Sequence, residues 1–359
     1  MIGIRADANE EIASGHIMRC MAIAAQLVRI GIEVKFYISD DYSVQLLESR
    51  DFKYYVLKND WRDKCGEIQD LVNVLARDAV TLLLVDSYEI DNEYFCSLHQ
   101  YVKLAYIDDL CRFACDVDVL INYAVQNCNK IYNDFRWGKM PRMLTGLSYT
   151  PLREEFAVIN EADVNCANIS REQPVQNIMI TTGGSDNFGL TAETAREILA
   201  LYEPAADNRL RLHILEGAFF NEDIKSKLLS LEKEYRSNII VHRNLQNIEN
   251  VLKDCQLVVS AGGTTLLEIC ACRKCCVCFA ISDNQKPLVE YLAGQNAVCA
   301  VYAPPEDTAR LAGTVAEAVY MLAGDCNKRR GLAAAAGSVV DGKGAERIAQ
   351  EINEFLKKY

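Results

Sequence analysis

The sequence contains no apolar run of the roughly 18 residues that a membrane-spanning helix requires. Its first residues carry charges at Arg5, Asp7, Glu10 and Glu11, and they lack the apolar segment of a signal peptide. We therefore expect a soluble, cytoplasmic protein that does not act on a membrane.

Positive charge is also scarce. The chain has 38 Lys and Arg residues against 50 Asp and Glu residues, which gives a formal net charge of -12. Because a nucleic-acid backbone selects a basic protein face, we expect no nucleic-acid partner. The acidity does not exclude an anionic small molecule, since helix N-termini and one local base can bind one.

Paired metal-binding knuckles are absent, although the chain has 15 cysteines. The densest group is Cys270, Cys272, Cys275, Cys276 and Cys278, which spans the end of a helical pattern and an apolar strand pattern. Free cysteine packs as a small hydrophobe, so we interpret this group as core filling, with a metal site as the alternative. We expect neither a metal ion nor another cofactor.

Apolar strands alternate with amphipathic helices along most of the chain. In the first half the pattern predicts strands at 2–6, 33–38, 53–57, 81–85, 104–107 and 119–122; in the second half it predicts strands at 177–182, 210–215, 239–242, 257–260 and 276–281. This alternation is typical of doubly wound α/β domains, and 359 residues suit two of them. We predict two Rossmann-like domains facing a cleft.

The expected boundary lies in the polar, unpatterned stretch 161–173. We therefore assign residues 1–160 to an N-terminal domain and residues 174–340 to a C-terminal domain. Residues 341–359 form a last segment, in which a helix is expected at 344–357 and can pack back on the first domain.

Polar residues of the first domain follow its strands, where doubly wound folds bind ligands. They are His16, Asp86, Ser87, Tyr88, Asp108 and Asn122. Ser14 can cap the helix that follows the first strand, which places Gly15 and His16 in its first turn. The helix dipole disfavours a positive charge there, so His16 is suited to act as a neutral base. A plain capped helix is the alternative interpretation.

Two glycine pairs in the second domain each follow a strand and precede a helix, in GGSD (183–186) and AGGTT (261–265). Such turns let the backbone approach an anion, and two of them favour a diphosphate. Neither matches a dinucleotide or Walker motif. Glu268 can accept hydrogen bonds from ribose hydroxyls, and Asn284 and Gln285 can bind a sugar or base. The expected substrate-binding residues of this half are Gly183, Gly184, Ser185, Gly262, Gly263, Thr264, Glu268, Asn284 and Gln285.

The order of several motifs resembles a known family. They are RADAN, SGHIMRC, VDSYEI, YIDDL, GLSYTPLREEF, TTGGSD, SAGGTTLLE and SDNQ. In this order the chain resembles the UDP-sugar hydrolases of the pseudaminic acid pathway and their relatives in spore-coat polysaccharide synthesis. The similarity runs from about residue 2 to about residue 303, and DGKGAERI (341–348) is similar to the spore-coat branch.

The resemblance implies a GT-B-like fold in which residues 1–160 form the sugar and catalytic domain and residues 174–340 form the UDP-binding domain. The implied reaction is hydrolysis of UDP-2,4-diacetamido-2,4,6-trideoxy-β-L-altropyranose to UDP and the free sugar, with inversion. His16 matches the family's catalytic histidine, and Tyr88, Glu268 and Asn284 match further cleft positions. The remaining substrate-binding residues that we expect are Asp7, Gly15 and Arg19.

The chemistry of such a reaction needs a base, a positioned water and a site for the leaving diphosphate. His16 can be the base, with Asp7 or Asp86 as an assistant, and the glycine turns can hold the diphosphate without a metal. Asp116 and Asp118 precede a strand, so we interpret this pair as a loop. A glycosyltransferase of the same fold and a non-catalytic nucleotide-sugar-binding module stay open as alternatives, as does the oligomeric state.

Overall fold

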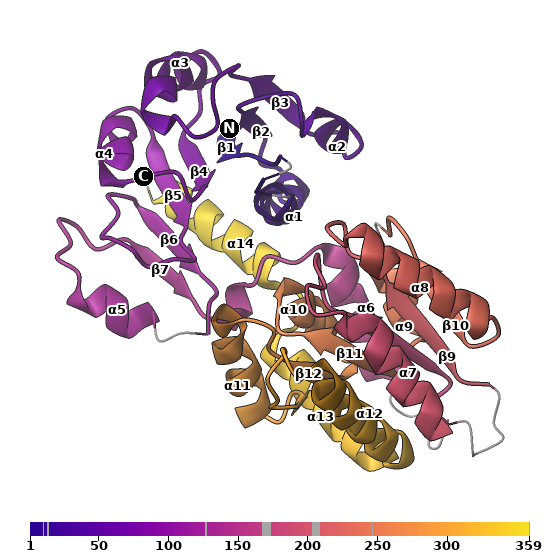
Figure 1. The fold of residues 1–359 in the computed structure, drawn as a ribbon. Coiled ribbons are helices and arrows are strands. Elements are labelled where there is room, and N and C mark those ends of the chain that lie inside the picture. Colours follow the sequence, from indigo (N-terminus) through magenta and orange to yellow (C-terminus); the bar gives the residue numbers. More distant parts are fainter. Residues whose placement is uncertain are drawn as a thin grey trace. The chain divides into compact units, whose positions relative to one another are not determined.

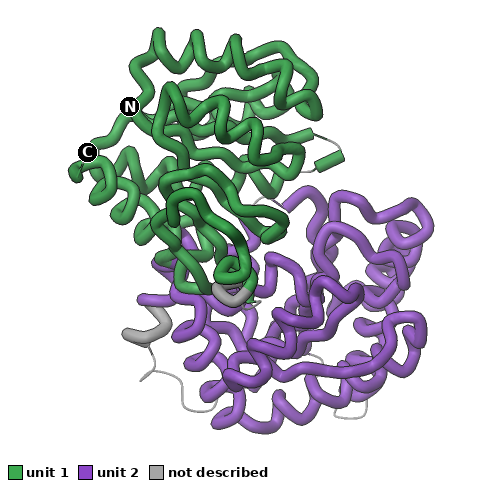
Figure 2. The backbone as a smooth tube through the Cα atoms, turned by 90° about the vertical axis from the view of Figure 1, so that its left-hand side faces the viewer, with its two compact units in different colours: residues 1–153, 343–359 green, residues 154–342 purple. Residues whose placement is uncertain are grey.

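The computed structural model describes residues 1–9, 11–12, 14–125, 128–166, 174–202, 209–245 and 247–358. They divide into two compact units, which Figure 2 colours separately. Unit 1 comprises Met1–Arg153 and Lys343–Tyr359, and unit 2 comprises Glu154–Gly342. Within the described residues, no helix has the length and apolar character to cross a membrane.

Unit 1 contains a seven-stranded sheet in which every pair of neighbours is parallel. In spatial order its strands are β3 (Lys53–Val56), β2 (Val34–Ile38), β1 (Ile2–Ala6), β4 (Leu82–Asp86), β5 (Lys103–Ile107), β6 (Val119–Asn122) and β7 (Arg142–Thr145). The strand order reverses between β1 and β4, which lie side by side. A doubly wound sheet binds its ligands at such a switch point.

Helices cover both faces of this sheet (Figure 1). They are α1 (Gly15–Arg29), α2 (Val44–Glu48), α3 (Lys64–Arg77), α4 (Asn92–His99), α5 (Cys128–Asp134) and α14 (Gly344–Lys357), with a short 3₁₀ helix, η1 (Leu147–Tyr149). One core contains α1 and α14. The other contains residues of α3 and α4. The unit is therefore a three-layer α/β/α domain.

Helix α14 begins and ends where the sequence pattern predicts. Its apolar residues recur at helical spacing, and Ala345, Ile348, Ile352 and Phe355 are buried in the core that α1 also enters. The last segment of the chain therefore completes the core of unit 1.

The start of α1 differs in detail from the expectation. Ser14 occupies the N-cap position, but its side chain makes no capping hydrogen bond. The ψ angle of Ser14 is 5°, whereas an N-cap whose hydroxyl reaches the first turn is typically extended. Gly15 and His16 still form the first turn, as predicted.

Unit 2 contains a six-stranded parallel sheet. In spatial order its strands are β10 (Ile239–His242), β9 (Arg211–Leu215), β8 (Asn177–Thr181), β11 (Leu257–Ala261), β12 (Cys275–Phe279) and β13 (Cys299–Ala300). Its helices are α6 (Glu154–Cys166), α7 (Leu190–Tyr202), α8 (Glu222–Glu234), α9 (Ile248–Asp254), α10 (Thr264–Ala271), α11 (Lys286–Gly294), α12 (Thr308–Gly324) and α13 (Cys326–Val339), with a 3₁₀ helix, η3 (Asp283–Gln285). The order reverses between β8 and β11.

The division between the units falls before α6, whereas the sequence analysis placed the end of the first domain at residue 160. Helix α6 contacts α10, and the Asn160 amide donates to the Gly337 carbonyl at 3.2 Å, so 154–160 pack with unit 2. The helix continues to Cys166 where an unpatterned stretch was expected, and 167–173 lie outside the described residues.

The dense cysteine group lies in the interior of unit 2. All five of its members are buried, in α10, β12 and the turn between them. Burial raises the pKa of the Cys270 thiol to about 12, which keeps it protonated. The interpretation of this group as core filling is confirmed.

Candidate active site

The switch point of unit 1 carries His16 and Asp86 on adjacent elements. His16 lies in the first turn of α1, directly after the loop that follows β1, and Asp86 is the last residue of β4. The Nδ1 atom of His16 lies 2.6 Å from Oδ1 of Asp86. Because an ionised carboxylate only accepts hydrogen bonds, Nδ1 carries the proton and Nε2 is the nitrogen that can accept another. His16 is 7% exposed.

Arg19 holds Asp86 in place. Its Nε and Nη2 atoms each donate to one carboxylate oxygen of Asp86, both at 2.6 Å, one turn of α1 beyond His16. Burial by itself raises the pKa of Asp86, but the Arg19 guanidinium and the His16 ring lower it to about 2. The carboxylate is therefore ionised at neutral pH. Its negative charge lies beside the Nδ1 side of the His16 ring.

The opposite side of the Arg19 guanidinium binds two residues that the sequence analysis did not select. Its Nη1 atom donates to Oδ2 of Asp109 at 2.6 Å and to the Tyr123 hydroxyl at 2.5 Å. Asp109 follows β5 and Tyr123 follows β6. The strand-end rule, by which polar residues directly after a strand are candidates for the site, selected Asp86 and could have found both.

Tyr88 links this cluster to the surface. Its hydroxyl donates to Oδ2 of Asp109 at 2.9 Å, and its ring stands edge-on to the His16 ring with 4.5 Å between centroids. Tyr88 is 38% exposed, so it forms a partly open wall beside the histidine. Gly15, in the same helical turn as His16, is exposed, with no atom within 4 Å of the position its Cβ would occupy.

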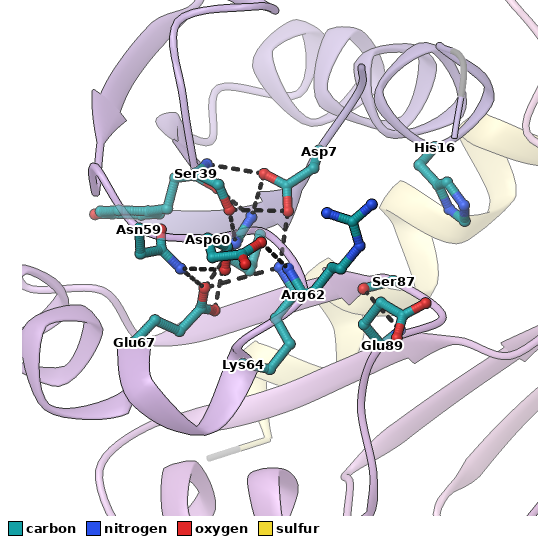
Figure 3. A network of polar contacts seen from close by, with 12 residues as sticks. Asp7, His16, Ser39, Asn59, Asp60, Arg62, Lys64, Glu67, Ser87 and Glu89 are labelled. Carbon is teal, nitrogen blue, oxygen red and sulfur yellow. Dashed lines mark hydrogen bonds and ion pairs between the residues drawn. The ribbon is translucent and has the colours of Figure 1, made fainter. Parts of the chain in front are cut away.

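Asp7 belongs to a separate buried network of charged groups (Figure 3). Its carboxylate accepts from Lys64 Nζ at 2.7 Å and from the Ser39 backbone N–H at 2.8 Å, and it pairs with Arg5 at 2.7 Å. Arg5 also donates to both oxygens of Glu67, at 2.8 and 2.7 Å. Burial raises the pKa of Asp7, but Arg5 and Lys64 together hold it well below its usual range. Both carboxylate oxygens of Asp7, which we expected to bind substrate, are therefore bonded to other residues of unit 1.

Asp108 and Asn122 also follow strands, but they bond to the loops around them. Asp108 accepts from the backbone N–H groups of Leu110 and Cys111 and from the Tyr132 hydroxyl. The Asn122 amide donates to the Tyr132 hydroxyl at 2.9 Å. These contacts shape the edge of the sheet around the His16 cluster.

The two glycine turns of unit 2 lie at its own switch point, after the neighbouring strands β8 and β11. Gly183 has a φ of 87°, a conformation that favours glycine. At Gly262 a Cβ would lie 2.6 Å from Val289, so the close packing of α11 requires glycine there. Turns of this kind, with Gly263 as the N-cap of α10, let the backbone approach an anion such as a diphosphate.

The turn after β8 is fixed by its surroundings. The Phe219 backbone N–H donates to the Gly184 carbonyl at 2.9 Å, and the Phe219 ring is 57% exposed. Asp186 caps α7 by accepting from the N–H groups of Leu190 and Thr191. Ser185, between Gly184 and Asp186, is partly exposed and lies in the turn itself.

The remaining predicted residues of unit 2 lie on or beside the same edge of the sheet. Thr264 begins α10, and Glu268 lies one turn later and is partly buried. Asn284 is exposed and its Oδ1 accepts from the Ser282 hydroxyl at 2.5 Å. Gln285 Oε1 accepts from the Ile281 backbone N–H at 3.1 Å, so its carbonyl group supports the loop.

A hollow of about 600 Å³ adjoins this loop, within the size range of small-molecule sites. Residues on either side of Asn284 in sequence line it, among them Ser282, Asp283 and Lys286. Lys286 pairs with Asp283 at 2.6 Å on its rim. The hollow lies after β12, and none of residues 261–265, the glycine turn after β11, lines it.

Comparison with known proteins supports the fold. No family model matches the chain. An uncharacterized protein of Methanocaldococcus jannaschii is 23% identical over 276 residues; the match includes 74% of this chain and 53% of the relative, so the chain spans about half the length of that relative.

Two solved structures are similar over the whole chain. The UDP-GlcNAc 2-epimerase of Neisseria meningitidis, bound to UDP-GlcNAc, has a TM-score of 0.68 at 11% identity and full coverage of both chains. A glycosyltransferase of Rickettsia africae has a TM-score of 0.65 at 12% identity, covering 100% of this chain and 99% of that one. These likenesses show the predicted fold class, two Rossmann-like α/β domains of the GT-B type.

Proposed function

We propose that this protein is an enzyme that acts on a UDP-sugar, with the nucleotide bound by unit 2 and the base supplied by unit 1. The observation that carries this proposal is the contact between His16 and Asp86 at the switch point of unit 1. A carboxylate that fixes the Nδ1 proton leaves Nε2 available as a base.

Unit 2 supports the nucleotide part of the proposal. Its two glycine turns follow neighbouring strands, so their backbone N–H groups can bind the same diphosphate. The glycosyltransferase and the UDP-GlcNAc-bound epimerase that share this fold are consistent with a nucleotide-sugar ligand. In this proposal Glu268 accepts from the ribose hydroxyls, and Asn284 binds the sugar.

The finer proposal is hydrolysis of the anomeric C–O bond of UDP-2,4-diacetamido-2,4,6-trideoxy-β-L-altropyranose, or of a close UDP-sugar. It rests on the resemblance of GHIMRC (15–20) and the motifs after it to the hydrolases of the pseudaminic acid pathway. The products are UDP and a free sugar of inverted configuration, which can serve nonulosonic acid synthesis.

The reaction has four bond changes. The oxygen of a water molecule forms a bond to the anomeric carbon while Nε2 of His16 takes one of its protons. The bond between the anomeric carbon and the diphosphate oxygen breaks, and its electron pair leaves with UDP. Asp86 stabilises the imidazolium, and the helix N-termini beside the glycine turns stabilise the charge on UDP.

The experiment is incubation of the purified protein with a panel of UDP-sugars, with and without acceptors, followed by NMR of the products. UDP with free sugar supports the hydrolase. UDP with a glycosylated acceptor identifies a transferase, and a UDP-sugar with a changed stereocentre identifies an epimerase. Binding without turnover, for every UDP-sugar in the panel, would identify a binding module.

A further inference from the structure

Arg19 has little capacity to bind a substrate, although its position in the GHIMRC motif led us to expect that role. Four donor contacts of its guanidinium are made within unit 1, two to Asp86 and one each to Asp109 and Tyr123. A guanidinium has five N–H donors in total, and the Arg19 side chain is 12% exposed. The arginine therefore acts on the residues around it.

The balance of charge in this cluster is uneven. The ionisable side chains that face His16 and Arg19 come from α1 and from the segments at the ends of β4, β5 and β6: Cys20, Asp86, Tyr88, Asp109 and Tyr123. Burial raises the pKa values of Cys20, Tyr88 and Tyr123, so these groups are uncharged at neutral pH. Two carboxylates thus share one guanidinium, and the net charge is -1 while His16 is neutral.

We propose that Arg19 and Asp109 are positioning residues that act through Asp86 and set the pH range in which His16 works as a base. The inference rests on the proposed function, because it concerns the same reaction. Arg19 aims Oδ1 of Asp86 at Nδ1 by binding both carboxylate oxygens. Asp109 fixes the far side of the guanidinium, and its charge offsets part of the repulsion between Arg19 and a protonated His16. The Nη2 atom of Arg19 lies 3.2 Å from Nδ1 of His16.

The two residues have opposite charges, so their removal has opposite effects. Without the carboxylate of Asp109 the cluster is neutral before His16 is protonated, and protonation becomes less favourable. Without the guanidinium of Arg19 its charge becomes -2, and protonation becomes more favourable. At an effective dielectric constant of about 20, a unit charge at about 12 Å moves a titration by about 1 pH unit, and a nearer charge moves it further.

The test is the pH dependence of kcat/KM. The acid limb of this profile reports the pKa of the base in the free enzyme. We expect Asp109→Asn to move this limb to lower pH by about 1 pH unit. We expect Arg19→Gln to move it to higher pH by more than that, because Arg19 is the nearer charge. Arg19→Lys keeps the charge but loses the two-point contact, so it should lower kcat about 10-fold or more with little movement of the limb.

The matched control is Asp118→Asn, which removes the same charge from a buried carboxylate of unit 1 that pairs with His99 at 2.8 Å. It should leave the limb in place. A limb that moves in the same direction in Asp109→Asn and Arg19→Gln, or moves no further than in the control, would overturn the proposal. If Arg19→Gln does not fold, Asp109→Asn and Arg19→Lys still decide between these outcomes.

A second readout does not require catalysis. The chain has four histidines, so the ¹⁵N resonances of the His16 ring can be assigned by comparison with His16→Ala and followed against pH by NMR. The titration of His16 should move in the variants as the acid limb does. This separates the two proposals: a protein that releases no UDP from any UDP-sugar contradicts the proposed function, whereas an unmoved His16 titration contradicts only the roles of Arg19 and Asp109.

Discussion

Replacement of Asp86 by Asn tests the central contact of the candidate active site. The variant keeps the shape of the side chain and removes its charge. When His16 takes a proton, the imidazolium and the carboxylate are about 4 Å apart, which corresponds to about 4 kcal/mol at an effective dielectric constant of about 20. Arg19, whose Nη2 atom lies 3.2 Å from Nδ1, is present in both proteins, so its repulsion of the imidazolium does not change between them. The lost attraction of about 4 kcal/mol predicts a loss of about 10³-fold in kcat.

The assay is UDP release from the UDP-sugar that the panel identifies. Because Asp86 is buried and binds Arg19, the variant should also unfold at a lower temperature, which a thermal melt followed by circular dichroism measures. Asp118→Asn is the matched control, since Asp118 is also buried and bonded to a histidine. It precedes β6, so it lies at the amino ends of the strands, whereas Asp86 lies at the carboxyl end of β4. It should lower stability and leave turnover unchanged. A folded Asp86→Asn protein with the turnover of the wild type would refute the role of the carboxylate.

Three further predictions concern the other parts of the reaction. His16→Ala should lower kcat by about 10² or more while UDP affinity stays the same, as the loss of a general base does; calorimetry with UDP and a turnover assay check both halves. Glu268→Ala should weaken UDP binding by roughly 1.5–3 kcal/mol, the range for hydrogen bonds to a charged group, and equal affinities would remove its ribose-binding role. In ¹⁸O-water the label should appear on the anomeric oxygen of the sugar, and activity should survive EDTA, because the glycine turns suit an intact leaving diphosphate; label in the nucleotide product would mean attack at phosphorus.

The parts of the fold that the sequence predicts well are those with a strong local pattern. Strand β4 is a continuous apolar run and α14 has a regular apolar face, and both lie where expected. Strand β7 was not predicted. It has four residues, Arg-Met-Leu-Thr, and of these only Leu144 is buried, because β7 is at the edge of the sheet and lacks the apolar run of a central strand.

The candidate site was predictable in position but not in its pairings. The strand-end rule selected His16 and Asp86, which the structure brings into contact. Asp7 and Arg19 were expected to bind substrate, yet both side chains are held by residues distant in sequence. Asp109 binds Arg19 from 90 residues away, and Lys64 binds Asp7 from 57 residues away. Such partners depend on the register of the whole sheet, which local patterns do not contain.

Unit 1 is built from two separate segments of the chain, and this has a consequence for biosynthesis. Domains of a chain generally fold as units, with the N-terminal one first. Here α14 fills part of the core of unit 1, so that core is incomplete until residues 343–359 have been translated, after all of unit 2. Until then the apolar face that receives Ile348 and Ile352 stays open to water and to other nascent chains. Unit 2, which is continuous in sequence, is the part of the protein that a ribosome finishes first, and the unit that carries His16 is completed only when α14 has been made.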